Sequence, residues 1–270
     1  MAGRLHIVAT PIGEPDDITL RALRILREVD VVAAEDTRTT RALLKHHGVD
    51  ARLVSYHDHN EQMRAPELVA RMLAGERVAL VSDAGTPLVN DPGWRLVRAC
   101  IDADIPIDVV PGACAAIAAL TGAGLPVDRF FFGGFLPRDT GPRRAALQAL
   151  ADVPATLIFY ESPQRLSATL EAMAGLWPTR AVCVARNLTK EHEQWIRGTA
   201  AEARAVLGDE TRGEVVLLVG RGEPQVADDA DVDAEIARLA DLPTKEAATR
   251  IAERFGIPRK EAYARVLKGR

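Results

Sequence analysis

The sequence contains 270 residues, with 34 Lys and Arg against 38 Asp and Glu, which gives a formal net charge of −4. This balance excludes a uniformly basic nucleic-acid coat and an acidic tail, so any anionic partner must be met by a local patch. With 47% hydrophobic and 27% charged residues, the composition is typical of a globular chain of one large or two medium domains.

Short runs of β-branched and aliphatic residues alternate with longer segments of helical period, which predicts βαβ units and a largely parallel sheet. A first set of strands is expected at residues 5–9, 31–34, 52–55, 78–81 and 107–110. A second set is expected at residues 130–135, 156–160, 181–185, 194–198 and 215–219. The Gly- and Pro-rich stretch 122–126 separates the sets, so we expect α/β domains over residues 1–122 and 123–227.

Residues 228–270 are expected to form a small helical module. Residues 228–243 hold six acids and one base, whereas residues 244–270 hold eight bases and three acids, a local charge of +5. Apolar residues at helical spacing precede Gly256 and follow Pro258, which predicts two short helices joined by a glycine turn, as in a helix-turn-helix. The charge pattern alone fits a dimerisation or core-capping hairpin equally well.

The sequence favours a cytoplasmic protein without a membrane span. The longest weakly polar stretch, residues 114–127, is shorter than the ~20 apolar residues of a transmembrane helix. The N-terminus leads into a candidate strand without the apolar region of a secretory signal. Cys100, Cys114 and Cys183 are widely spaced, so neither a disulfide framework nor a zinc knuckle is indicated.

The loops that follow the strands are the expected functional edge. Ligands of open α/β sheets bind outside the carboxyl ends of the strands, because loops converge there and helix N-termini offer free N–H donors. The loops after the first five strands are all polar or contain Gly or Pro, at residues 10–13, 35–38, 56–61, 82–87 and 111–115. Residues 161–165 and 187–191 continue this pattern.

Familiar phosphate-binding motifs are missing from the sequence. It contains no G-x-x-x-x-G-K-[ST], and no predicted strand is followed by G-x-G-x-x-G, which disfavours a P-loop NTPase and a Rossmann dehydrogenase. Gly85 and Gly112 instead offer places where the backbone can approach a ligand closely, although an ordinary strand exit uses glycine as well.

His57 and His59, with Asp58 and Glu61 beside them, raise the possibility of a metal site, because both imidazoles would share one face of a strand end. Third and fourth ligands are not evident at zinc-like spacing. We therefore predict no metal and favour hydrogen bonding to a substrate.

Structural alternatives stay open for the other charged loops. Glu35 and Asp36 ahead of Arg38 also fit a capped helix start, with acids near the positive end of the helix dipole. Glu161 and Arg165, four residues apart, also fit an ion pair within the first turn of a helix.

Taken together, these loops resemble those of the tetrapyrrole methylase superfamily. The resemblance is carried by ATPIG at 9–13, AEDTR at 34–38, HDHNE at 57–61, VSDAGTP at 81–87 with DPG at 91–93, and VPG at 110–112. With GFLP at 134–137, FYESP at 159–163 and LTK at 188–190, the chain is similar to the RsmI-type branch, the small-subunit RNA (cytidine-2′-O)-methyltransferases. The match covers residues 4–222, and the basic tail resembles that branch's C-terminal extension. Glu14-Pro15 and Asn187 depart from its usual residues.

The resemblance implies two α/β domains with S-adenosylmethionine in the cleft between them, a homodimer and no metal. It implies methylation of a cytidine 2′-oxygen in 16S ribosomal RNA within the 30S subunit. The cofactor contacts carried over are Pro11, Gly13, Asp83, Gly85, Thr86, Cys114, Ala115, Tyr160, Glu161, Glu214 and Val215.

A ribose hydroxyl must lose its proton when it is methylated, so we expect polar strand-end residues around the acceptor. The hypothesised catalytic residues are Glu35, Asp36, His57, Asn60, Glu161 and Lys190, with a carboxylate or His57 as the proton acceptor. The hypothesised substrate contacts are Arg38, Glu61 and Arg165 and, in the basic tail, Arg259 and Lys260. The alternatives are methylation of a tetrapyrrole precursor carbon and a nonenzymatic RNA- or cofactor-sensing module. The paired acids and the basic tail favour RNA.

Overall fold

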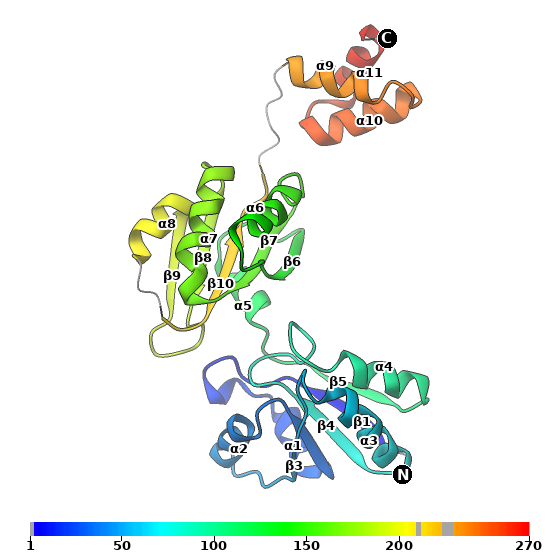
Figure 1. The fold of residues 1–270 in the computed structure, drawn as a ribbon, viewed down its shortest axis with the longest axis vertical. Coiled ribbons are helices and arrows are strands. Elements are labelled where there is room, and N and C mark those ends of the chain that lie inside the picture. Colours follow the sequence, from blue (N-terminus) through cyan, green and yellow to red (C-terminus); the bar gives the residue numbers. More distant parts are fainter. Residues whose placement is uncertain (1–2, 209–211, 223–228, 270) are drawn as a thin grey trace.

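The first sheet is entirely parallel, with strand order β3-β2-β4-β1-β5. The structure is a computed structural model that describes residues 3–208, 212–222 and 229–269 (Figure 1). The strands are β1 (Arg4–Val8), β2 (Val31–Ala34), β3 (Leu53–Ser55), β4 (Arg77–Val81) and β5 (Ile107–Val110). Helices cover both faces, which explains why the central strands read as continuous apolar runs.

One face of this sheet is covered by α1 (Leu20–Glu28) and α2 (Thr37–His46), and the other by α3 (Glu61–Leu73) and α4 (Trp94–Asp102). A short 3₁₀ helix, η1 (Pro15–Asp17), precedes α1. The Thr19 side chain accepts a hydrogen bond from the Ala22 N–H and so caps α1.

The second sheet has the order β6-β7-β10-β8-β9. Its strands are β6 (Phe130–Phe135), β7 (Thr156–Glu161), β8 (Ala181–Arg186), β9 (Gln194–Thr199) and β10 (Val215–Val219). The β6–β7 ladder is parallel, but the β7–β10, β10–β8 and β8–β9 ladders are antiparallel. The strand positions are therefore confirmed, whereas the prediction of a largely parallel arrangement is wrong here. The seven-residue connection between β8 and β9 is too short for a crossover helix, so these strands must run antiparallel.

One face of the second sheet packs against α6 (Thr140–Ala149), α7 (Pro163–Leu176) and α8 (Ala200–Leu207). The other face packs against α5 (Ala115–Gly122), whose small apolar side chains share a core with Ile158 and Leu218. The expected division at residues 122/123 assigned α5 to the first domain, but its buried contacts are with the second sheet.

The C-terminal lobe contains α9 (Asp229–Arg238), α10 (Thr244–Phe255) and α11 (Arg259–Lys268) around a core that includes Ile251 and Val266. Gly256 ends α10 with φ +64°, which confirms the glycine turn. Helix α9 was not expected from the acidic stretch. It forms because Val232 and Ile236, four residues apart, bury one apolar stripe in this core.

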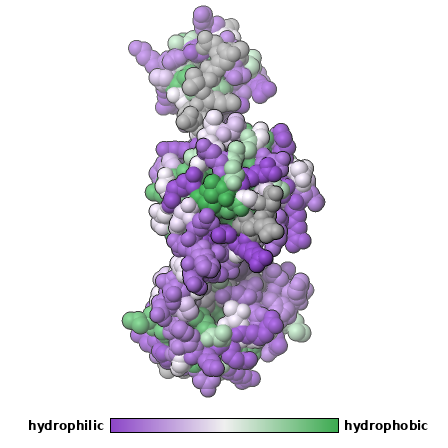
Figure 2. All heavy atoms as spheres, turned by 90° about the vertical axis from the view of Figure 1, so that its left-hand side faces the viewer, coloured by the Kyte–Doolittle hydropathy of each residue, from purple (hydrophilic) through white to green (hydrophobic). Residues whose placement is uncertain are grey.

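The three units follow one another as successive lobes (Figures 1 and 2). On the face shown in Figure 2, hydrophobic side chains gather on the middle lobe, whereas the lobe of the first sheet is mostly hydrophilic. Among the described residues, the helices are all too short or too polar to cross a membrane.

Candidate active site between the two sheets

The loops after the first-sheet strands are joined to one another, as predicted. Thr10 and Gly85 exchange two backbone hydrogen bonds, with N···O distances of 2.8 and 3.1 Å. The Thr86 hydroxyl donates to the Ala113 carbonyl at 2.9 Å, which links the β4 and β5 loops. The three parallel strands β1, β4 and β5 therefore deliver their loops to one edge.

The loop after β1 also reaches the second unit. The Glu14 N–H donates to Thr189 Oγ1 at 3.0 Å. A Cβ added at Gly13 would lie 2.6 Å from the same oxygen and 2.7 Å from the Leu188 carbonyl oxygen. Only glycine permits this approach, so the predicted residue Gly13 lies at the contact between the two units.

A cavity of about 390 Å³ opens where the two groups of loops face each other, a size that suits a small-molecule ligand. Of the predicted cofactor contacts, the cavity is lined by Gly85, Thr86, Ala115, Tyr160, Glu161, Glu214 and Val215. The predicted contacts Pro11, Gly13, Asp83 and Cys114 are chain neighbours of lining residues but do not line it themselves. Lining residues that the sequence reasoning missed include Ile12, Val89, Asn90, Asp91, Phe135 and Leu188.

Carboxylates gather at the first-unit side of this cavity. Burial, together with the negative charges of Glu35, Asp83 and Asp58, raises the pKa of the cavity-lining Asp91 to about 6. Burial also raises the pKa of Glu35, whose carboxylate accepts a hydrogen bond from the Asp83 N–H at 3.3 Å. Burial, with the nearby charge of Asp36, raises the pKa of Asp83. Because like charges crowd here, a cationic ligand group would relieve the repulsion.

The cavity fits the donor S-adenosylmethionine in its chemistry. Ile12, Val89, Leu188 and Val215 supply apolar lining for an adenosine, and the carboxylates suit a positively charged sulfur. Gly85, at φ +83°, exposes backbone to the cavity at a position where a side chain would be strained.

Asp36 and Arg38 form the start of α2. Asp36 Oδ1 accepts from the Arg38 N–H at 2.8 Å, and the Arg38 guanidinium lies 2.6 Å from Asp36 Oδ2. These bonds to Arg38 lower the pKa of Asp36 to about 2. This is the capped helix start that the sequence left as an alternative. The Asp36 N–H also donates to Asp83 Oδ1 at 2.9 Å, so the cap is attached to the carboxylate cluster.

Asn60 shapes the turn that carries His57. Its Oδ1 accepts from the His57 N–H at 2.9 Å, and its Nδ2 lies 2.8 Å from Ser55 Oγ and 3.2 Å from His57 Nε2. His57 Nδ1 is buried and has no hydrogen-bond partner within the described part of the chain. The ring of His59 lies edge-on to that of His57, with centroids 5.9 Å apart.

A group of possible metal ligands forms elsewhere than the sequence suggested. Among the described residues, ligand atoms of Asp16, His46 and His47 lie within 4.8 Å of one another, whereas His57 and His59 belong to no such group.

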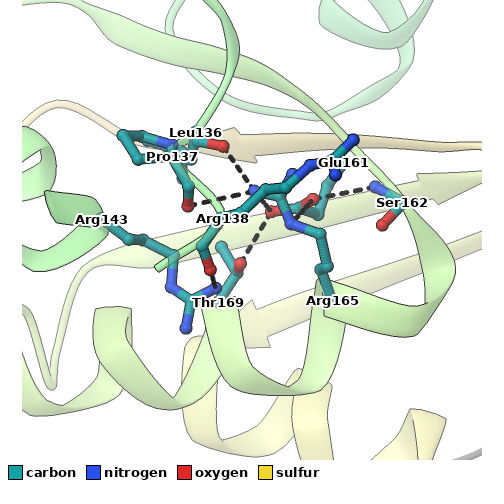
Figure 3. Close-up of polar contacts among 8 residues, drawn as sticks. All are labelled: Leu136, Pro137, Arg138, Arg143, Glu161, Ser162, Arg165 and Thr169. Atoms are coloured by element: carbon teal, nitrogen blue, oxygen red, sulfur yellow. Dashed lines mark hydrogen bonds and ion pairs between the residues drawn. The ribbon is translucent and has the colours of Figure 1, made fainter. Parts of the chain in front are cut away.

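Glu161 turns its side chain into the second unit (Figure 3). Its side chain is 0% exposed, and its carboxylate accepts from the Ser162 N–H at 2.9 Å and from the Thr169 hydroxyl at 2.7 Å. Arg165 Nε lies 3.2 Å from Glu161 Oε1, and the same guanidinium donates to the Pro137 carbonyl at 3.2 Å. The alternative of an ion pair in the first helical turn is therefore the observed arrangement.

Two further predicted residues have ion-pair partners near the cleft. Lys190 Nζ lies 2.8 Å from Glu214 Oε2, which joins the β8–β9 loop to the start of β10. Glu61 Oε1 accepts from Arg95 Nε at 2.7 Å, which ties the N-terminus of α3 to that of α4.

Arg259 and Lys260 lie at the start of α11 in the helical lobe. Arg259 donates to the Thr249 hydroxyl of α10 at 2.6 Å, whereas the Lys260 side chain is exposed. These two residues belong to a different lobe from the other predicted site residues.

Comparison with known proteins agrees with this geometry. Residues 4–204 match the family of tetrapyrrole (corrin/porphyrin) methylases, and residues 226–270 match the RsmI C-terminal HTH domain. A ribosomal RNA small subunit methyltransferase I from Escherichia coli O157:H7 is 49% identical over 275 residues, which cover 98% of this chain and 95% of the relative. The protein of the same name from Micromonospora olivasterospora is 48% identical and covers 98% of this chain and 87% of the relative.

Solved structures share the fold at lower identity. Uroporphyrin-III C-methyltransferase from Thermus thermophilus, solved with S-adenosylhomocysteine, is 23% identical with a TM-score of 0.58, over 81% of this chain and 97% of that chain. A diphthine synthase is 17% identical with a TM-score of 0.61, over 80% of this chain and 89% of that chain. The chain therefore belongs to the tetrapyrrole methylase family and, within it, to the ribosomal RNA small subunit methyltransferase I family.

Proposed function

We propose that this protein methylates the 2′-oxygen of a cytidine ribose in 16S ribosomal RNA, with S-adenosylmethionine as the methyl donor. The observation that carries the proposal is the position of Asp91, a carboxylate with its pKa raised to about 6, on the wall of the cavity between the two units. Membership of the small-subunit methyltransferase family supports the RNA substrate.

The reaction needs alignment and one proton acceptor. Bound in the cavity, S-adenosylmethionine would supply an electrophilic methyl group on a positively charged sulfur. The two units hold the reactants between them, and positioning of this kind lowers a barrier by up to ~7–11 kcal/mol when the geometry is ideal. The ribose oxygen forms a bond to the methyl carbon, the carbon–sulfur bond breaks, and its electron pair remains on the sulfur.

Asp91 accepts the hydroxyl proton in this proposal. A general base works best when its pKa lies close to the operating pH, and a pKa of about 6 leaves Asp91 mostly ionised at neutral pH. Glu35 and Asp83 act through Asp91, because their charges contribute to its raised pKa. The Nδ1 atom of His57 is unpartnered but buried, so a hydrogen bond from it to the nucleotide would require the side chain to turn toward the cleft.

The other sequence-derived residues take supporting roles. Asp36 and Asn60 position the strand-end loops, and Glu161 fixes the turn into α7. Lys190 and Arg38 would contact neighbouring phosphates and Glu61 a ribose hydroxyl, whereas Arg165, which is paired with Glu161, would act by holding the turn after β7. Arg259 and Lys260 on the helical lobe would contact the RNA backbone, which makes binding depend on salt.

We also propose that the protein acts in the cytoplasm as a homodimer on the 30S subunit. The edge strand β6 leaves Phe130 and Phe131 exposed, and such an apolar edge supports contact with a second copy. The family match to small-subunit methyltransferases supports the ribosomal context.

The test offers unmodified 30S subunits and a uroporphyrinogen-type substrate side by side, with S-adenosylmethionine labelled in its methyl group. We expect label in RNA only, and mass spectrometry of the digested RNA should identify 2′-O-methylcytidine. Label on the tetrapyrrole, or on a nucleobase, would overturn the proposal. Efficient donor binding with no methylated product on any rRNA would indicate a sensing module instead.

A further inference from the structure

Phe135 is an exposed aromatic residue at the mouth of the cavity. Its side chain is 53% exposed, yet it is one of the residues that line the cavity. None of the roles assigned above uses it. An exposed aromatic ring at the mouth of a cleft stays in contact with water, and its apolar surface is buried only when a ligand covers it.

A β-bulge aims Phe135 at the cleft. The β6–β7 register runs from Phe130↔Thr156 to Phe132↔Ile158 and then shifts, so that Phe135 pairs with Tyr160. An unbroken register would pair Phe135 with Glu161 and turn its ring to the opposite face, toward α7. The bulge therefore moves the ring to the same face as Tyr160, and such bulges commonly re-aim side chains next to active sites.

The bulge packs closely against the opposite wall of the cleft. Gly134 has φ +60°, and a Cβ there would lie 2.5 Å from Asn90 Oδ1 of the first unit. Asn90 and Leu88 themselves have φ +70° and +72°, a conformation that costs energy for residues with side chains. The left-handed backbone of Leu88 and Asn90 in the first unit thus meets the glycine turn of the second unit next to Phe135, at the site where ligands would enter.

The ring of Phe135 is supported from behind. The Tyr160 ring lies edge-on to it, with centroids 5.9 Å apart, and Phe132 packs against Tyr160 in the same manner at 4.9 Å. This aromatic group holds the Phe135 ring in one orientation and presents it at the cavity mouth. A supported, partly exposed ring of this kind is how proteins stack unpaired nucleobases.

We propose that Phe135 is the platform on which the base of the target nucleotide stacks while its ribose enters the cavity. The inference rests on the proposed function, because it requires an RNA substrate. It assigns a base-binding subsite made mainly from the second unit, opposite the carboxylates of the first. Stacking needs no particular hydrogen-bonding edge, so the subsite contributes affinity and orientation more than choice of base.

The experiment compares two variants of Phe135 and one control variant by steady-state methylation of 30S subunits. Phe135→Leu keeps apolar bulk but removes the aromatic face, and we expect the KM for 30S to rise ~10-fold or more. Phe135→Trp restores a stacking surface and should keep that KM within about twofold of the wild type. The matched control is Val206→Ala, an exposed apolar residue on α8 of the same unit but outside the cavity lining, which should leave KM unchanged.

Two binding measurements separate this subsite from other roles. Isothermal titration should give the same Kd for S-adenosylmethionine in Phe135→Leu and the wild type, and light scattering should give the same molar mass. An unchanged KM for 30S in Phe135→Leu, a weakened donor Kd, or a lower molar mass would each overturn the inference. A wild-type enzyme that methylates no RNA would instead overturn the proposed function.

Discussion

The environment of Asp91 disfavours the ionised form of its carboxyl group. Burial and three neighbouring carboxylates raise its pKa from the ordinary value of 3.8 to about 6, so the folded protein holds this proton more tightly than the unfolded chain does. Stability therefore falls as the pH rises from about 4 to 6 and stays reduced above that range. The ionised Asp91 carboxylate therefore lowers the stability of the fold. This cost is consistent with a residue that is kept because the methylation reaction needs it.

Replacing Asp91 by Asn should raise the stability of the protein and lower its methylation rate. Asp91→Asn removes the charge, and we expect unfolding above pH 7 to cost on the order of 2 kcal/mol more than in the wild type. The turnover number should fall ~10²–10⁴-fold, because the proton acceptor is lost. Urea denaturation at pH 4 and pH 8 measures the first effect. It should be small at pH 4, and a variant less stable than the wild type at pH 8 would contradict the argument.

The pH dependence of methylation tests Asp91 separately. The wild-type rate should fall below about pH 6, because a protonated Asp91 cannot accept the hydroxyl proton. In Asp91→Asn the remaining rate should lose this acidic limb. Single-turnover rates between pH 5 and 8 provide the measurement, and an acidic limb that persists unchanged in the variant would assign the proton to another group.

Glu161, in contrast to Asp91, stabilises the fold, because its buried carboxylate is paired with Arg165 and hydrogen-bonded to Thr169. Removing one partner of a buried ion pair leaves the other unpaired, so Glu161→Ala should reduce the free energy of unfolding by ~3–5 kcal/mol. Glu171→Ala is the matched control, because Glu171 forms an exposed pair with Arg204 and should cost at most ~1 kcal/mol. Chemical denaturation of both variants checks this, and equal effects would contradict the assigned role of the Glu161 carboxylate.

At this scale the sequence predicted the loops better than the side chains. Residues directly after strands were located correctly, because the carboxyl ends of parallel strands must meet at one edge. Asp91 lies ten residues beyond β4, and its place on the cavity wall depends on a turn with positive φ at Leu88 and Asn90. Asparagine adopts positive φ more readily than most residues, but leucine gives no indication of it, so the turn as a whole was not predictable. The inward direction of Glu161 likewise depends on Arg165 and Thr169 from the following helix.

At the scale of elements, the ten predicted strands were confirmed because each is a short apolar run bounded by polar residues. Their pairing in the second sheet was not predictable in this way. β10 lies between β7 and β8 although it follows both in the chain. A local sequence pattern does not indicate which strand a given strand will pair with. The shift in β6 that aims Phe135 was missed for the same reason.

The helical lobe offers a test of RNA contact at the level of an element. Lys260→Glu should weaken RNA binding and reduce the slope of log affinity against log salt by about one. Arg250→Gln is the control, because Arg250 pairs with Glu246 at 3.0 Å within α10 and is already partly neutralised. Filter binding of 30S RNA at several salt concentrations gives both slopes. Identical slopes in Lys260→Glu and the wild type would contradict RNA contact by Lys260 and indicate a structural role for the lobe.

At the scale of the whole molecule, the two sheets must hold a fixed separation for the cleft to work. Gly13 and Thr189 define that separation, since a Cβ on Gly13 has no space. Gly13→Ala should weaken donor binding ~10-fold or more by moving the walls apart, because small misplacements are costly at such sites. Gly175→Ala, where an added Cβ meets nothing within 4 Å, should leave donor affinity unchanged. Titration calorimetry with S-adenosylmethionine compares the two variants, and equal affinities would contradict a close-packed cleft.

The most direct test of the whole account is a crystal structure of the protein with S-adenosylhomocysteine. The account predicts that this molecule lies in the cavity between the sheets, against Gly85, Thr86 and Val215, with its sulfur on the side of Asp91. Binding at any other surface, or in the cavity with the sulfur turned away from the carboxylates, would contradict it.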